Sequence, residues 1–94
     1  MTSDIVEKTE RYERLLEEAL ETAAVAPRPT SPLHEAALAC VEMADAYLED
    51  GRHFLEADDR VNALAAFSYG HAWLDAGARI GLLDVPEEGH LFTV

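Results

Sequence analysis

The sequence predicts an all-α fold, a three-helix bundle in which the second and third helices form an antiparallel hairpin. Three observations lead to this prediction. Apolar residues recur every three or four positions along three long segments, which is the period of an amphipathic helix. Prolines cluster between the first two segments, and only a short acidic turn separates the second from the third. At 94 residues, the chain is long enough for one such domain, spanning 1–94, and too short for two.

The first helix is expected over residues 3–25. Ser3 is a suitable N-cap, and acidic residues follow it in the first turn, where they complement the helix dipole. The apolar stripe of this segment comprises Ile5, Tyr12, Leu16, Ala19 and Ala23. The opposite face is acidic, so this helix should cover a core on one side and face solvent on the other.

The second helix is expected over residues 32–56. Pro32 follows Ser31 and fits the first helical position, where the missing N–H donor is not needed. The apolar residues that recur at helical spacing are Leu33, Ala37, Cys40, Val41, Ala44, Leu48 and Leu55. Gly51 lies inside this run and costs about 1 kcal/mol relative to alanine, unless a close contact requires it.

The third helix is expected over residues 58–80. The connection 57–59 is so short that it forces the second and third helices into an antiparallel hairpin, and Asp58 or Asp59 would cap the new helix. Gly81 is typical of the residue that follows a helix and ends it.

The third helix is apolar nearly all round, which indicates burial on more than one side. Because three helices of this length cover it on two sides at most, its remaining side and the tail (81–94) form a candidate interface. The candidate interface residues are Phe67, Trp73, Leu74, Leu82 and Leu83. We expect a homo-oligomer, with a dimer favoured, or a contact with another protein partner.

Four polar residues form a candidate polar seam: Asp50, His71, Asp75 and Arg79. The last three are spaced four apart on one stripe of the third helix, and Asp50 would face them from the second. A structural interpretation makes them an ion-paired seam that orients the two helices. The alternative is a ligand-binding or enzymatic site. We assign no metal, no cofactor and no catalytic residue, because neither a full ligand set nor a nucleophile with its base converges here.

The charge is strongly acidic, with 19 Asp and Glu residues, 7 Lys and Arg residues and a net charge of -12. Lys8 is the only lysine. Such a surface stays hydrated in molar salt, so we expect a halophile's cytoplasmic protein. The lack of clustered cations argues against a nucleic-acid partner. The uncharged stretch 61–74 is too short to span a bilayer, we expect no signal peptide at the N-terminus, and Cys40 alone makes no internal disulfide.

Several spaced motifs resemble a small archaeal family catalogued as domain of unknown function 357. They are YLEDGRHF at 47–54, NAL at 62–64, YGH at 69–71 and WLDAGARIG at 73–81, so the second and third helices match best. One departure is the Asp58-Asp59 turn, where the family tends to have Gly-Asp. The resemblance implies a short archaeal helical bundle. It implies no reaction, and no residue inherits a catalytic role from it.

These observations favour a non-enzymatic helical module for protein interaction or self-association. The alternative is a small ligand-binding or enzymatic domain that uses the polar seam. A third interpretation, an accessory protein of RNA or ribosome complexes, is disfavoured by the missing basic patch.

Overall fold

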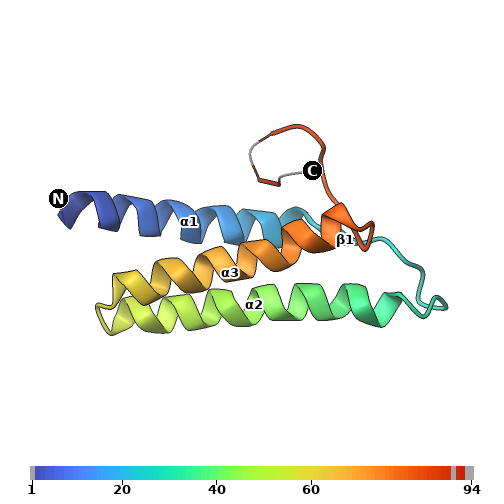
Figure 1. Ribbon diagram of the computed structural model, residues 1–94, viewed down its shortest axis with the longest axis horizontal. Helices are drawn as coiled ribbons and strands as arrows, with labels where there is room; N and C mark the ends of the chain where they lie inside the picture. The colour runs from blue at the N-terminus through green and yellow to red at the C-terminus, as the bar shows by residue number, and fades with distance from the viewer. Residues whose placement is uncertain (1, 90, 93–94) are drawn as a thin grey trace.

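The protein is a bundle of three long helices, and two short strands, one after the first helix and one after the third, pair to form a β ribbon (Figure 1). The structure, a computed structural model, describes residues 2–89 and 91–92. Its elements are α1 (Thr2–Thr22), β1 (Ala24–Val25), α2 (His34–Glu56), α3 (Arg60–Arg79) and β2 (Leu83–Asp84). The predicted helical fold class is confirmed. Within the described part of the chain, no helix combines the length and hydropathy that a bilayer crossing needs.

Helix α3 is the central element of the bundle. It lies between α1 and α2 in Figure 1 and packs against both, whereas α1 and α2 meet each other less. Because the α2–α3 connection is so short, these two helices run antiparallel, as predicted. The molecule measures 48 × 26 × 16 Å and is therefore thin along the direction of view in Figure 1.

Helix α1 ends at Thr22, three residues before its predicted end at 25. The next residues form β1, which pairs antiparallel with β2 of the tail. The pairing with the tail replaces the last turn of the predicted helix, and the Ala26 N–H continues it by donating to the Leu82 carbonyl at 3.0 Å. The backbone near the end of α1 therefore finds hydrogen-bond partners in the tail, a long-range pairing that the sequence pattern did not indicate.

The starts of α1 and α2 also differ slightly from the predicted ones. Helix α1 begins at Thr2, which places the expected cap, Ser3, inside the first turn. Helix α2 begins at His34 rather than at 32. The residues before it form a turn in which the Leu33 N–H donates to the Ser31 hydroxyl oxygen at 3.1 Å. The serine thus stabilises the turn that precedes the helix.

The start of α3 follows the predicted acidic turn, although the helix begins at Arg60, two residues later than expected. Asp59 is the cap, and its carboxylate accepts from the Asn62 N–H at 3.2 Å and from the Asn62 side chain at 2.7 Å. Asp58 has a φ of 58°, a left-handed conformation that aspartate tolerates better than most residues.

The end of α3 is a Schellman motif. The Leu82 N–H donates to the Gly77 carbonyl at 2.8 Å, and the Gly81 N–H donates to the Ala78 carbonyl at 3.2 Å. Gly81 adopts a φ of 83°, which costs glycine little because it has no Cβ. The helix ends at Arg79, so the predicted role of Gly81 as its stop is confirmed.

The core fills the space where α3 meets its two neighbours and the tail. It comprises Leu16, Ala19, Ala37, Cys40, Ala44, Leu48, Ala63, Phe67, Leu74, Leu82 and Leu83. Phe67 is the largest fully buried side chain. Its ring lies against the backbone of Gly51, where an added Cβ would come within 2.2 Å of the ring. This close contact explains why a glycine occupies the middle of α2.

We predict that Gly51→Ala destabilises the fold even though alanine is the better helix former. The added methyl group would displace the Phe67 ring, and overpacking of this kind costs about 1–3 kcal/mol. Chemical denaturation followed by circular dichroism measures the change. Asp50→Ala is the matched control, because Asp50 is exposed on the same helix and should shift the free energy of unfolding by less than about 0.5 kcal/mol. Equal stability of the two variants would contradict the packing argument.

Candidate functional site

The outward face of α3 carries large apolar side chains that its own chain leaves uncovered. The exposed fractions are 73% for Val61, 61% for Tyr69, 39% for Trp73 and 71% for Ile80. No Asp, Glu, Lys or Arg occurs between Val61 and Leu74. Exposed alanines at 65, 72 and 76 lie between the larger residues at helical spacing. We call this surface the α3 face.

The α3 face continues onto α2 through aromatic side chains. The rings of Tyr47 and Tyr69 lie 5.7 Å apart at a tilt of 46°, a favourable arrangement for an aromatic pair. These two residues, Ala72, Trp73 and Ala76 line a shallow hollow of about 300 Å³. The hollow is lined mainly by aromatic and other apolar atoms.

The predicted interface needs correction, because four of its five residues are buried inside the chain. Phe67 and Leu74 are fully buried, and Leu82 and Leu83 retain only 9% and 4% exposure. The tail explains the difference, since β2 pairs with β1 and places both leucines on the core. Of the predicted set, Trp73 alone contributes to the α3 face.

The helical spacing of the α3 residues divides them between two opposite sides of the helix. The buried positions 63, 67, 70, 74 and 77 follow one side of the helix, and the exposed positions 61, 65, 69, 72 and 76 follow the other. Both sides are apolar, however, so the sequence pattern alone does not indicate which of them faces the core.

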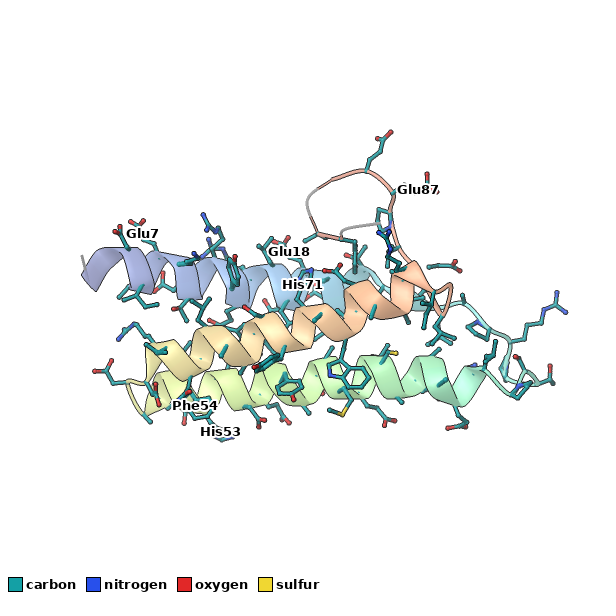
Figure 2. All side chains as sticks on the ribbon, in the orientation of Figure 1. Glu7, Glu18, His53, Phe54, His71 and Glu87 are labelled. Carbon is teal, nitrogen blue, oxygen red and sulfur yellow. The ribbon has the colours of Figure 1, made fainter. Side chains whose placement is uncertain are left out.

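Acidic side chains surround the α3 face on the outer surfaces of the flanking helices. Figure 2 shows Glu7 and Glu18 pointing away from the bundle on α1. On α2, the exposed acidic residues are Glu35, Glu42, Asp45, Glu49, Asp50 and Glu56. From Val61 to Ala76 the α3 face is therefore an uncharged band on a strongly acidic molecule, and Arg79 lies at its C-terminal end.

A second hollow, of about 270 Å³, lies between α1 and α3 beneath the tail. We call it the α1–α3 groove. Its lining residues are Tyr12, Leu15, Phe67, Ser68, His71, Ala72, Asp75 and Leu91. Ala72 lines both hollows, so the α1–α3 groove and the aromatic hollow are neighbours on the two sides of the α3 ridge.

Two of the four residues of the predicted polar seam meet in the α1–α3 groove. The His71 Nε2 atom lies 4.0 Å from the Asp75 carboxylate and also contacts the Leu91 carbonyl oxygen. The His71 ring lies 6.1 Å from the Phe92 ring. His71 therefore holds the tail against α3, and Figure 2 shows it at the border of α1 and α3.

The predicted orientation of the seam is wrong. It was expected to join α3 to α2, but His71 and Asp75 face α1 and the tail. Asp50 and Arg79 are exposed elsewhere, on α2 and in the last turn of α3. The separation of four residues places His71, Asp75 and Arg79 on neighbouring turns of α3, yet it does not indicate which helix packs beside them.

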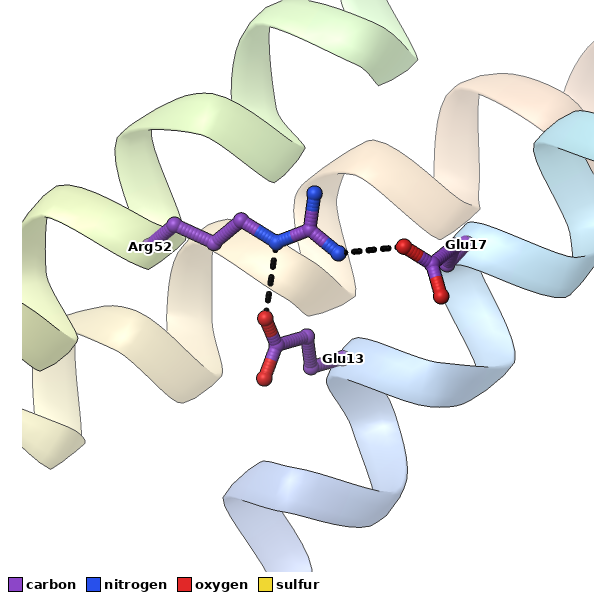
Figure 3. Close-up of polar contacts among 3 residues, drawn as sticks. All are labelled: Glu13, Glu17 and Arg52. Atoms are coloured by element: carbon purple, nitrogen blue, oxygen red, sulfur yellow. Dashed lines mark hydrogen bonds and ion pairs between the residues drawn. The ribbon is translucent and has the colours of Figure 1, made fainter.

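The polar link between helices comes instead from Arg52, which sequence reasoning missed. Its Nε atom donates to Glu13 at 2.7 Å, and another guanidinium nitrogen donates to Glu17 at 2.6 Å (Figure 3). These hydrogen bonds, first the one to Glu13, raise the pKa of Arg52. The two ion pairs join α2 to α1. They contribute modestly to stability, because all three side chains are partly exposed.

The described residues offer little for metal or thiol chemistry. Among them, no three His, Cys, Asp or Glu side chains gather closely enough to hold a metal ion. Cys40 is buried on α2, and its sulfur lies near Gly77 of α3. A buried thiol in such apolar packing behaves as a small hydrophobic side chain.

We predict that His71→Leu loosens the tail without unfolding the helices. The variant loses the contact from the ring nitrogen to the Leu91 carbonyl, and one such hydrogen bond contributes about 1 kcal/mol. Limited proteolysis of the tail beyond β2 should therefore become about fivefold faster, while the helical circular dichroism signal stays unchanged. Ser68→Ala is the control, because the Ser68 hydroxyl donates to Leu64 of its own helix. An unchanged rate of tail cleavage in His71→Leu would contradict this role.

Comparison with known protein families supports the resemblance of the sequence motifs. Residues 11–83 match the family described as Protein of unknown function (DUF357). The match extends beyond α2 and α3 to the second half of α1 and to the tail leucines. No curated protein and no solved structure matches the chain. Because the matched region covers more than half of its length, the chain belongs to the DUF357 family.

Proposed function

We propose that this chain is a non-enzymatic helical interaction module whose contact surface is the α3 face. One observation carries the proposal: a molecule with a net charge of -12 leaves an uncharged band exposed along its central helix. Patches of this kind mark interaction sites on soluble proteins.

The composition of the α3 face suits a binding site. Tyr69 and Trp73 belong to the residue types that dominate binding energy at protein interfaces. Covering the exposed part of each ring removes on the order of 100 Å² from water, which stabilises a complex by about 2 kcal/mol per residue. The aromatic hollow next to them can receive a partner side chain.

The acidic surroundings determine when this contact forms. At low salt, two acidic surfaces repel each other, whereas at about 1 M salt the screening length falls to roughly 3 Å and the repulsion fades. Contact through an uncharged band survives these conditions. We therefore infer a cytoplasmic setting in a salt-loving archaeon, in keeping with the single lysine and the excess of acids.

We predict that Tyr69→Glu weakens binding strongly while leaving the fold intact. Tyr69 is 61% exposed, so the substitution disturbs little of the core, but it places a charge in the middle of the α3 face. The loss of about 2 kcal/mol corresponds to roughly thirtyfold weaker binding. A tagged chain expressed in its source cells and purified at molar salt should retain a binding protein, identified by mass spectrometry. The tagged variant should not retain it.

Ala46→Glu is the matched control for this experiment, because it adds the same charge at an exposed position on the outward side of α2. It should retain the same proteins as the unsubstituted chain. Equal retention by Tyr69→Glu would remove the support for the α3 face as the contact surface.

A second function, small-ligand binding, is supported by the α1–α3 groove. Its volume of about 270 Å³ is near the lower limit of ligand pockets, and its walls combine apolar rings with a carboxylate. Tyr12 and Leu15 would contact an apolar ligand, and Asp75 would bind a cationic group. We therefore propose a small aromatic amine as the ligand of the α1–α3 groove.

The substitution Asp75→Asn separates this function from a structural role. If the groove binds a ligand, we expect the variant to lose most of its affinity for tryptamine, because the neutral amide no longer pairs with the ammonium group. The melting temperature should stay within about 2 °C of that of the unsubstituted chain. Asp50→Asn, which removes an exposed carboxylate from α2, is the control. A melting temperature lowered by several degrees would assign Asp75 to the fold instead.

A further inference from the structure

We infer that the partner covering the α3 face is a second copy of this chain, packed with its α3 antiparallel to the first. This inference rests on the proposed function and names the occupant of that surface. Three features of the molecule support it: its surplus surface area, the self-complementary shape of the α3 face, and the distribution of charge at the two ends of α3.

The surface area is larger than a compact monomer of this size requires. The accessible surface is 6035 Å², whereas a monomer of 10.3 kDa averages about 5,400 Å². The surplus, on the order of 700 Å², accompanies the flat and elongated shape of the molecule, and a standard protein interface buries roughly 800 Å² of each partner. One broad side of a body measuring 48 × 26 × 16 Å has room for such a contact.

The α3 face is suited to contact with its own copy. It extends from Val61 to Ile80, a length of about 28 Å along the helix, and its midpoint lies between Tyr69 and Ala72. A two-fold axis at this midpoint places the bulky Tyr69 of one copy against Ala72 of the partner subunit. A closed pair of this kind buries the same surface on both subunits and leaves no surface open for further growth.

The charges select the antiparallel orientation. The N-terminal end of α3 adjoins Glu56 and Asp58, whose side chains are 79% and 84% exposed, and Asp59 lies between them and the helix. Arg60 offsets one of these three charges by pairing with Asp58. The C-terminal end carries the exposed Arg79.

Antiparallel packing brings each Arg79 beside the acidic turn of the other copy, whereas parallel packing brings the two acidic turns together. Of the acidic residues of the tail, Asp84 belongs to β2, which pairs with β1, and Glu87 stands on the α1 side of the bundle, away from α2 (Figure 2). The dipoles of two antiparallel helices also favour the antiparallel arrangement, by a smaller amount.

Two cysteine variants test the inference, each made together with Cys40→Ala so that no other thiol is present. Ala65→Cys and Ala76→Cys replace exposed residues about 16 Å apart along α3, and a disulfide requires Cα atoms within about 7 Å. In the antiparallel pair, position 65 faces position 76 of the partner. Mild oxidation of the mixed variants should therefore yield mainly a covalent heterodimer, while each variant alone should remain largely uncrosslinked.

Light scattering at molar salt and tens of micromolar protein completes the test. We expect a dimer for the unsubstituted chain and a monomer for Tyr69→Glu. A strictly monomeric unsubstituted chain overturns the inference, although retention of a different protein in the purification experiment would leave the proposed function standing. A dimer in which Ala65→Cys crosslinks with itself, or in which the mixed variants do not crosslink, overturns the antiparallel arrangement.

Ala46→Cys is the matched control for crosslinking. It places a thiol on the exposed outward side of α2, so it should crosslink neither with itself nor with the two α3 variants. Efficient crosslinking of this control would show that collisions, rather than a defined interface, produce the covalent species, and would overturn the inference as well.

Discussion

The ring of Phe67 lies directly on the backbone of Gly51, and this contact sets the distance between α3 and α2. Gly70 does the same one turn further along α3, where an added Cβ would lie 2.8 Å from Leu16 and 3.1 Å from the Ala44 carbonyl oxygen. Small residues at these crossings let three backbones approach closely around one aromatic ring. The core of a chain this short depends on that close packing, because it has few other large side chains to bury.

The same packing explains why one side of α3 remains exposed. Helices α1 and α2 cover the side of α3 that contains Phe67 and Leu74, and the ribbon between β1 and β2 brings Leu83 to the end of the core near Gly77. None of the elements within residues 2–89 and 91–92 covers the side that contains Tyr69 and Trp73. The exposure of this apolar surface is therefore a consequence of the architecture.

Charge and hydrophobicity are separated over the molecular surface. Acidic residues occupy the outer sides of α1 and α2, while the α3 face has none between Arg60 and Asp75. The inter-helix ion pairs of Arg52 lie among acidic residues, where they offset part of the repulsion between α1 and α2. High salt weakens such pairs and weakens the repulsion between acidic surfaces as well, so contact between molecules then depends mainly on the apolar band.

Local features of the sequence determined the three helices, the antiparallel hairpin, an aspartate cap at 58 or 59 and the Gly81 stop, because each depends on residues only a few positions apart. Only the tertiary structure decided which apolar residues of α3 are core, that His71 faces α1 and the tail, and that Arg52 reaches Glu13. Those outcomes depend on where α1 and the tail pack. That placement arises from contacts between distant segments. Helical periodicity does not indicate these contacts, because both sides of α3 are apolar.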